Sequence, residues 1–401
     1  MALTIALLTA GVVAVAPQAE AQTETTGRAA GADRLPVTEV GATNWTQVSA
    51  GGSHTCGLRA SGRLFCWGSD ANGQLGDGGT NTNQPAPVQV AGGATNWATV
   101  EAGNDHTCAL KTTGRLFCWG ADFGGQLGDG APIQDQDQPV QVAGGATDWT
   151  ALSAGGDHNC ARKTGRLFCW GQDFFGQIGD GGANLDQLEP VRIGSATNWV
   201  GVDPGYRHTC ARRATGRIYC WGSDSNGQLG NGGPNTERSA PVQIAGGATN
   251  WASIDSGSYH SCARRNSGRL YCWGDDREGE LGDGPPNTEH AAPVQVAGGA
   301  TNWTAVSGGY AHTCARRATG RIYCWGDDES GQLGDSVANT DHDEPVQVAG
   351  GATNWTAVDG GWDQSCARKA NGRLYCWGDD FYGQLGNGAP NADRARPVQV
   401  A

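Results

Sequence analysis

Methionine, lysine and long apolar runs are almost absent from this sequence. Among its 401 residues there are one methionine and three lysines, whereas 66 residues are glycine. Glycine at this density favours turns and strands over helices, so the composition predicts a β-rich chain. After the first residues no apolar run is long enough to cross a bilayer, and we expect no membrane span.

Positive charge is also in deficit, and recognisable catalytic motifs are missing. The formal net charge of −13 opposes the phosphate backbone, so we expect no nucleic acid partner. The sequence contains no Gly-x-Ser-x-Gly motif, no phosphate-cradling loop and no evident set of nucleophile, base and acid. We therefore predict no catalytic residues, no cofactor and no enzymatic activity.

The first 21 residues have the pattern of a signal peptide. Leu3 to Ala16 are apolar or small, and Ala19-Glu20-Ala21 forms an A-x-A cleavage signal, although no lysine or arginine precedes the apolar stretch. We expect the mature chain to begin near Gln22. A flexible linker is predicted over residues 22–35 and the folded domain over residues 36–401.

Cysteine, by contrast, is plentiful. Fourteen cysteines behind a leader peptide indicate disulfides formed in an oxidising compartment. We therefore expect a secreted protein, extracellular or periplasmic. The excess of arginine over lysine and the alanine-rich leader favour a bacterial source.

The cysteines reveal an internal repeat. The first cysteine of each unit recurs every 52 residues, with one step of 50, at Cys56, Cys108, Cys160, Cys210, Cys262, Cys314 and Cys366. Periods of this length are typical of propellers and arrays, since each unit exposes an apolar face that only its neighbours cover. Each unit contains four strand-like runs separated by glycine-rich turns. The sequence predicts an all-β fold, a seven-bladed β-propeller of four-stranded antiparallel blades.

The central hairpin of each unit has a register that can be counted. A three-residue loop at residues 60–62 sets Arg59 opposite Arg63, and counting back places Cys56 opposite Cys66. Such cysteines form a non-hydrogen-bonded pair with Cα atoms roughly 4.5 Å apart, which suits a cross-strand disulfide. In the third unit a two-residue loop, Thr164-Gly165, compensates for one missing residue. The predicted disulfides are Cys56–Cys66, Cys108–Cys118, Cys160–Cys169, Cys210–Cys220, Cys262–Cys272, Cys314–Cys324 and Cys366–Cys376.

Metal binding is the alternative use of these repeated residues. Zinc requires Cys-x-x-Cys spacing or histidine partners, which directly opposed cysteines do not provide, so we expect no zinc. The loop from Asp70 to Asp77 lacks the alternating oxygen ligands and final glutamate of an EF-hand, and the sequence leaves calcium binding open.

Six units begin the hairpin strand with histidine, and the seventh has Gln364. The histidines are His54, His106, His158, His208, His260 and His312. Such a ring suggests metal binding or pH sensing, but equivalent positions on separate blades lie far apart, and glutamine replaces one of them. We expect each histidine to hold the turn of its own blade.

Two further repeated elements concern packing and closure of the ring. Fourteen of the fifteen tryptophans occupy two fixed positions of the unit, which predicts packing between blades. A Pro-Val element occurs eight times against seven hairpins, so one terminal copy is surplus. Residues 37–40 or residues 398–400 are the candidates for an edge strand that closes the ring beside partners distant in sequence.

Residues 103–140 contain four short motifs that point to a known family. These are Gly-x-x-His-Thr-Cys-Ala, Gly-Arg-Leu-x-Cys-Trp-Gly, Gly-Gln-Leu-Gly and Pro-Val. The run resembles the regulator-of-chromosome-condensation repeat, and the resemblance covers all seven units, residues 36–401. It implies a seven-bladed propeller, in agreement with the number of units. It implies no single function, because one fold hosts many roles.

Charge is expected to separate between the two faces of the propeller. Hairpin tips carry cations, among them Arg213, Arg265 and Arg317, whereas the opposite strand ends carry aspartates such as Asp70 and Asp122. We expect the arginine face to bind an anionic partner, either an acidic protein or an anionic component of the cell envelope. The alternative is a solvated surface.

The remaining candidates are aromatic residues that break the symmetry of the repeat. They are Phe174, Phe175, Trp362, Phe381 and Tyr382. Exposed aromatic rings beside acids stack on sugars or contact protein.

These patterns predict a secreted, monomeric, non-enzymatic scaffold that binds an unidentified protein or an anionic envelope component. A carbohydrate-binding propeller is the second hypothesis, and a propeller enzyme such as a lyase is the third.

Overall fold

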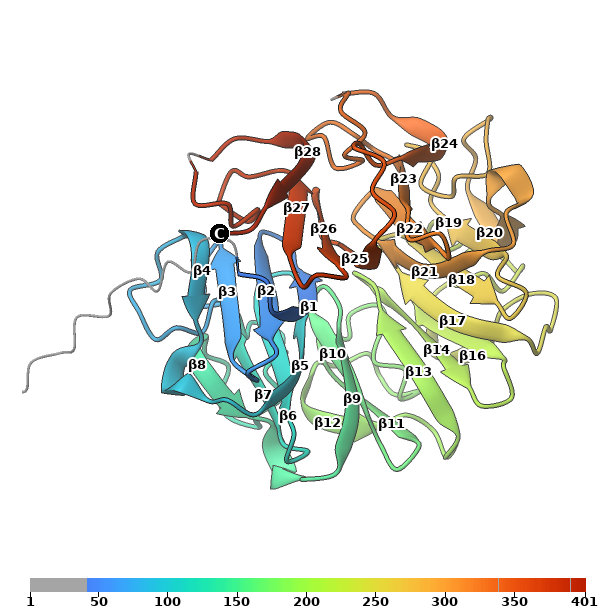
Figure 1. Ribbon diagram of the computed structural model, residues 1–401. Coiled ribbons are helices and arrows are strands. Elements are labelled where there is room, and N and C mark those ends of the chain that lie inside the picture. The colour runs from blue at the N-terminus through green and yellow to red at the C-terminus, as the bar shows by residue number, and fades with distance from the viewer. Residues whose placement is uncertain (1–41, 338, 390) are drawn as a thin grey trace, which may run out of the picture. The chain divides into compact units, whose positions relative to one another are not determined.

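Seven four-stranded antiparallel sheets surround a common axis in the computed structural model, which describes residues 42–401 apart from positions 338 and 390 (Figure 1). Each sheet is one contiguous stretch of chain. The protein is therefore an all-β, seven-bladed propeller, as the repeat predicts. The predicted leader, linker and first Pro-Val element, residues 1–40, lie outside the described residues.

Within each blade the four strands follow one another from the axis to the rim. The innermost strands of blades 1 to 7 are β1 (Trp45–Ala50), β5 (Trp97–Ala102), β9 (Trp149–Ala154), β13 (Trp199–Pro204), β17 (Trp251–Ser256), β21 (Trp303–Gly308) and β25 (Trp355–Gly360). The second strands are β2 (His54–Arg59), β6 (His106–Lys111), β10 (His158–Lys163), β14 (His208–Arg213), β18 (His260–Arg265), β22 (His312–Arg317) and β26 (Gln364–Lys369). The third strands are β3 (Leu64–Gly68), β7 (Leu116–Gly120), β11 (Arg166–Gly171), β15 (Ile218–Gly222), β19 (Leu270–Gly274), β23 (Ile322–Gly326) and β27 (Leu374–Gly378).

The rim of the ring is formed by the Pro-Val strands. They are β4 (Gln84–Gln89), β8 (Gln136–Gln141), β12 (Gln187–Arg192), β16 (Arg238–Gln243), β20 (His290–Gln295), β24 (His342–Gln347) and β28 (Arg394–Gln399). Short 3-10 turns follow three of them: η1 (Ala91–Gly93), η2 (Ala143–Gly145) and η3 (Ala297–Gly299). Among the described residues no helix is long and apolar enough to cross a membrane.

The hairpin register agrees with the register counted from the sequence. Cys56 pairs with Cys66 across β2 and β3, and the amide of Arg59 donates to the carbonyl of Arg63 at 3.0 Å. All seven predicted cysteine pairs are disulfides, with Cα atoms 4.0 or 4.1 Å apart. Cross-strand bonds of this kind stiffen each blade without joining one blade to the next.

The third blade preserves its disulfide through a different turn. Thr164 and Gly165 have φ values of 51° and 73°, the left-handed conformation that both central residues of a two-residue type I′ turn require. Cys160 therefore still lies opposite Cys169.

Both faces of each blade are apolar because a neighbouring blade covers each of them. The disulfide of blade 1 packs in one core cluster with Trp97 and Trp119 of blade 2. Within a blade the two repeated tryptophans pack against each other, as in blade 4, where the ring centroids of Trp199 and Trp221 lie 6.3 Å apart. The predicted role of the tryptophans in blade packing is confirmed.

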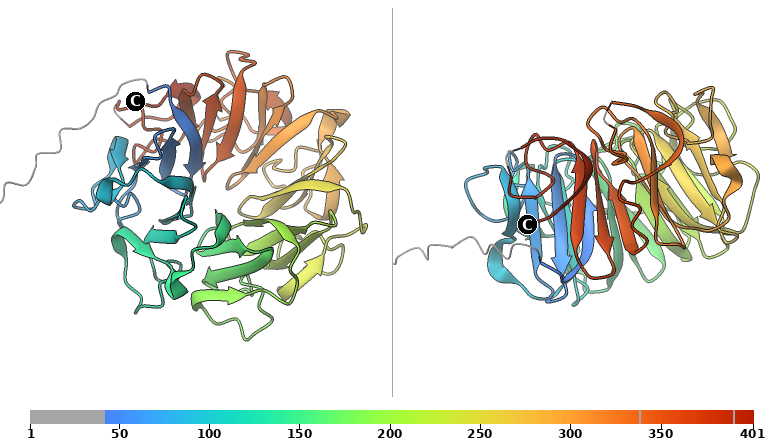
Figure 2. Two further views of the ribbon diagram at one scale, coloured as in Figure 1. Left: turned by 60° about the horizontal axis from the view of Figure 1, so that its bottom comes forward. Right: turned by 45° about the horizontal axis from the view of Figure 1, so that its top comes forward.

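The ring closes by packing between blades 7 and 1, which lie side by side in Figure 2. Val398 of β28 pairs with Cys376 of β27 in the same blade. The expectation that the last Pro-Val element pairs with a strand distant in sequence is therefore wrong, because blade 7 is complete in itself. Trp67 of blade 1 donates from Nε1 to the carbonyl of Gln384 in blade 7 at 2.9 Å.

The antiparallel strands leave two different faces on the ring. We call the hairpin face the one that carries the turn at residues 60–62 and its equivalents. The loop face carries the turn at residues 51–53, the long loop at residues 69–83 and the equivalents of both.

Candidate functional site

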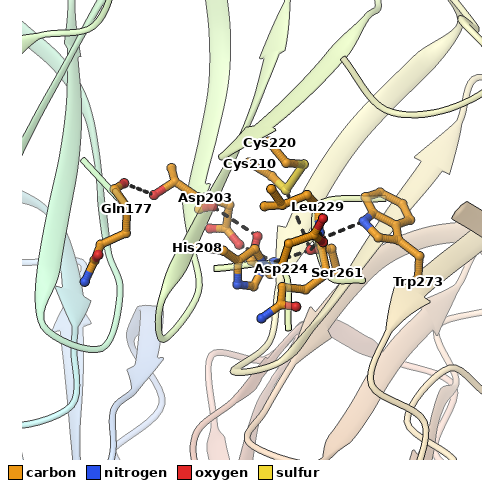
Figure 3. Close-up of a disulfide and its surroundings, with 12 residues drawn as sticks. Gln177, Asp203, His208, Cys210, Cys220, Asp224, Leu229, Ser261 and Trp273 are labelled. Atoms are coloured by element: carbon orange, nitrogen blue, oxygen red, sulfur yellow. Dashed lines mark hydrogen bonds between the residues drawn. A yellow bond between two sulfur atoms is a disulfide. The ribbon is translucent and has the colours of Figure 1, made fainter. Parts of the chain in front are cut away.

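Every junction between two blades contains one repeated hydrogen-bond network near the loop face. Figure 3 shows the junction of blades 4 and 5, where His208 Nε2 lies 2.8 Å from Ser261 Oγ. Ser261 Oγ donates to the carbonyl of Gln228 at 3.1 Å, and Trp273 Nε1 donates to the same carbonyl at 2.9 Å. Because the serine hydroxyl has one proton and gives it to Gln228, it accepts from His208, whose Nε2 carries the proton.

The histidines therefore fasten one blade to the next. We expected each to hold the turn of its own blade, and that expectation is wrong, because the partner of its Nε2 lies on the neighbouring blade. Burial lowers the pKa of His208 to about 3, which leaves it neutral. At the junction of blades 7 and 1, Gln364 Nε2 donates to the carbonyl of Gly51 at 3.0 Å. The described residues contain no group of three or more His, Cys, Asp or Glu arranged to hold a metal ion.

The repeated aspartates of the loop face are buried turn residues. Asp224 Oδ1 accepts from the amide of Leu229 at 3.0 Å, and all seven blades make this contact at 2.8–3.0 Å. These seven aspartates are at most 2% exposed. The expectation that they form a charged surface is wrong, because their carboxylates turn inward to bind backbone amides. In the loop from Asp70 to Asp77, one Asp70 oxygen is likewise bonded to the amide of Leu75.

A second set of carboxylates surrounds the axis on the innermost strands. Asp359 Oδ2 accepts from the amide of Ala50 at 2.7 Å, and Asp203 Oδ2 accepts from the amide of Ser256 at 2.5 Å. Each bond reaches the edge of the next blade, where an innermost strand has no further strand to pair with. Burial raises the pKa of Asp203 and of Asp359 to about 7. The sequence analysis missed this set, whose signal is an acid or serine five residues before each loop-face histidine or Gln364.

The cations of the hairpin tips are of two kinds. Arg213 stacks over Trp199 and Tyr219, with its guanidinium carbon 4.6 and 4.3 Å from the two ring centroids. Arg265 and Arg317 make the same stacks in their blades. These three predicted binding residues are therefore half-buried parts of the blade. The exposed cations are one arginine per blade on the other side of the turn: Arg63, Arg115, Arg166, Arg217, Arg269, Arg321 and Arg373.

The loop tips carry the most exposed aromatic residues. Phe174 and Phe381 are each 71% exposed, and each lies edge-on to the next residue in the chain, Phe175 or Tyr382. Phe123, which the sequence analysis missed, occupies the same tip position in blade 2 and is 53% exposed. Its alignment with Phe174 in the repeat could have identified Phe123 from the sequence. Three exposed rings therefore stand on blades 7, 2 and 3.

Four aromatic rings form a closed cluster on the loop face. Tyr206, Tyr259, Tyr310 and Trp362 contact one another in a cycle, with centroids 5.5–6.4 Å apart. Two of them also line a small cavity of about 80 Å³ that is otherwise enclosed largely by glycine-rich turns from all seven blades. The cluster therefore lies where the innermost strands reach the loop face.

Arg207 connects the cluster to the loop tips. Its guanidinium carbon lies 5.0 Å from the Tyr206 ring and 4.7 Å from the Phe175 ring. The structure thus brings together three of the predicted residues, Phe174, Phe175 and Trp362, through Tyr206 and Arg207.

The fold and these junctions define a disulfide-bonded seven-bladed propeller whose variable residues lie on the loop face. A family model described as the RCC1-like domain matches residues 18–297 and, in a second alignment, residues 134–401. The chain belongs to this family.

Relatives in the family have different roles. The chain is 31% identical over 360 residues to the ultraviolet-B receptor UVR8 of Arabidopsis thaliana, which covers 87% of this chain and 80% of that protein. It is 28% identical over 302 residues to the human E3 ubiquitin-protein ligase HERC2, covering 72% of this chain but 6% of that protein. It is 26% identical over 389 residues to the protein pim1 of Schizosaccharomyces pombe, covering 88% of this chain and 62% of that protein.

Two solved structures share the fold. Human WBSCR16 superposes with a TM-score of 0.72 at 19% identity, covering 81% of this chain and 87% of the other. Prp20p of Saccharomyces cerevisiae superposes with a TM-score of 0.70 at 23% identity, covering 79% and 80%.

Proposed function

We propose that this protein is a secreted, non-enzymatic scaffold that binds another protein through its loop face. The observation that carries the proposal is the exposure of Phe174 and Phe381, each 71% accessible on a loop tip. Large aromatic rings held out in water lose their exposed area when a partner covers them, and such residues dominate binding energies. Prp20p, which shares the fold, is described by its binding to Gsp1p and histones.

Export is part of the same proposal. Seven disulfides indicate an oxidising environment, and we propose that residues 1–21 are removed on secretion, followed by the linker at residues 22–35. Amino-terminal sequencing of the mature protein should find a start near Gln22. A mature chain that keeps Met1 contradicts this part of the proposal.

Cross-linking of the purified protein in culture medium or envelope extract tests the binding function. The Phe174→Ala and Phe381→Ala double variant should capture much less of the partner, by tenfold or more on the hot-spot scale of about 2 kcal/mol. Val200→Ala is a matched control, since Val200 is an exposed apolar residue at the hairpin end of β13. Equal capture by the double variant and the wild type contradicts a role for these loop tips.

The exposed arginines of the hairpin face support a second candidate function, which is binding of an anionic cell-envelope component. Seven arginines, one per blade, are exposed there, and a ring of like charges attracts a polyanion. Charge reversal at Arg63, Arg217 and Arg321 should abolish binding to envelope fractions. Retention of binding in that variant contradicts this candidate. A glycan array tests whether the aromatic tips recognise sugars, which would distinguish sugar binding from protein binding and from binding of an anionic envelope component.

A further inference from the structure

One glutamine of the repeat is a glutamate in blade 5. Six blades have glutamine between the two glycines of the long loop, and blade 5 has Glu280 at that position. In blade 6, Gln332 Oε1 accepts from the amide of Ser330 at 2.9 Å, while its Nε2 donates to Asp327 Oδ2 at 2.8 Å. In blade 6 the position therefore uses both an acceptor and a donor.

Glu280 keeps the acceptor and lacks the donor. Its Oε2 accepts from the amide of Glu278 at 3.0 Å. The carboxylate is bonded to backbone amides, those of Glu278 and of Glu280 itself, and it has no N–H to donate to a neighbouring acid. The residue that corresponds to Asp327 is another acid, Asp275.

These two carboxyl groups are enclosed by protein. Glu280 is 3% exposed and Asp275 is 5% exposed. Burial, together with the charge of Asp275, raises the pKa of Glu280 to about 8. Two adjacent buried carboxyls are unfavourable unless a proton or another cation lies between them.

Glu280 and Asp275 line a cleft of about 690 Å³ between blades 5 and 6 on the loop face. The acidic residues of its lining are Asp275, Glu278, Glu280, Asp327, Glu329 and Asp341. Arg277 is the cation among the described lining residues, and it is already paired, through Nε with Asp275 at 3.5 Å and through Nη2 with Glu289 at 3.1 Å. The cleft is therefore strongly anionic.

The lining also offers aromatic surface to a cation. Tyr259 and Tyr310 belong to both the cleft and the aromatic cluster. The faces of aromatic rings attract ammonium and guanidinium groups.

The spacing of the acids favours an organic cation over a metal ion. No three acidic, histidine or cysteine side chains among the described residues converge as metal ligands, so the carboxylates are spread along the cleft. Several separated positive charges fit this arrangement, and guanidinium groups form paired, charge-assisted hydrogen bonds with carboxylates. A volume of this size is typical of a ligand site and has room for more than one basic side chain.

We propose that the cleft between blades 5 and 6 binds an arginine- and lysine-rich segment of a partner protein, with one cation held by Glu280 and Asp275. This inference rests on the proposed protein-binding function, and it names the chemistry of a partner.

Fluorescence anisotropy with a labelled oligoarginine peptide tests the site. Glu280→Gln is the decisive variant, because it restores the residue of the other six blades and is therefore compatible with folding. We expect the wild type to bind with an affinity that falls with salt, and Glu280→Gln to bind about tenfold more weakly. Tyr310→Ala should weaken binding by a smaller factor. Glu189→Gln, an exposed acid on β12, makes the same change in net charge and should leave binding unaltered.

Two results would overturn the inference. Absence of binding by the wild type, or equal binding by Glu280→Gln and Glu189→Gln, means that Glu280 only shares a proton with Asp275. Calorimetry with calcium chloride alone provides a second measurement. If calcium binds, Glu280→Gln abolishes that binding, and the peptide does not bind, the cleft is a metal site instead. The proposed function is tested separately. If capture of a partner depends on Phe174 and Phe381, that function stands whether the cleft binds calcium or no cation at all.

Discussion

The junctions between blades and the loop tips above them come from the same repeat, yet the junctions are nearly uniform and the tips are not. Six junctions use a histidine and the seventh uses Gln364. One equivalent tip position, exposed in every blade, holds Ala71, Phe123, Phe174, Ser225, Arg277, Glu329 and Phe381. A junction residue is hydrogen-bonded to the neighbouring blade, so its replacement leaves a buried group unpaired. A tip residue faces water and is free to vary, which places the search for function at the tips.

Replacement of a junction tryptophan should separate the two regions most clearly. Trp221 is buried and donates from Nε1 to the carbonyl of Gln177 at 2.9 Å. Trp221→Ala should lower the free energy of unfolding by about 3–5 kcal/mol, because it leaves a cavity. Phe174→Ala should change it by less than about 0.5 kcal/mol. Denaturant unfolding at neutral pH measures both, and similar losses in the two variants would contradict the distinction.

Removal of one disulfide should have the next largest effect. The cysteines of blade 4 are 10 residues apart, and the double variant Cys210→Ala, Cys220→Ala should lose about 3 kcal/mol through the greater entropy of the unfolded chain. Thermal unfolding under non-reducing conditions measures this loss. Partner capture should be unchanged at a temperature where the variant is folded, and a loss of capture there would show that the tips depend on the hairpin below them.

Acid should weaken the junctions through their histidines. The pKa of His208 is about 3 in the folded protein and about 6.5 in the unfolded chain. Below pH 6.5 the unfolded chain therefore binds a proton that the folded protein does not, and stability is lost by about 1.4 kcal/mol per pH unit until about pH 3. His208→Gln copies Gln364 and carries no titrating group at this position. Between pH 7 and pH 5 its free energy of unfolding should fall by about 2 kcal/mol less than that of the wild type. Urea unfolding at the two pH values measures this difference, and an equal fall in the free energy of unfolding in the two proteins would contradict this role.

The smallest effect should separate the two kinds of cation on the hairpin face. Arg213→Met removes a stack over Trp199 and Tyr219 and should cost about 1 kcal/mol or less. Arg217→Met removes an exposed charge and should leave the free energy of unfolding unchanged. Denaturant unfolding measures both variants. A loss of stability in Arg217→Met and none in Arg213→Met would contradict this assignment.

The sequence predicted the candidate site only in part. Phe174, Phe175 and Trp362 stood out because each departs from the repeat, and the structure links them through Arg207 and Tyr206. Their connection could not be counted, because it joins rings on blades 3, 4 and 7. The stacking of Arg213 was missed for a related reason, since the charge of an arginine does not tell whether its guanidinium faces water or an aromatic ring.

The sequence by itself determined the features that depend on local counting. Strand order, hairpin register and the seven disulfides follow from short turns, because such a turn dictates which residues lie opposite each other. Tertiary structure alone decided which side chains meet across a junction: the histidine with the next blade, the axial carboxylates with a neighbouring edge, and the acids of blade 5 with those of blade 6 in one cleft. These contacts depend on the packing of one blade against the next, and the period of the repeat carries no information about how two blades face each other.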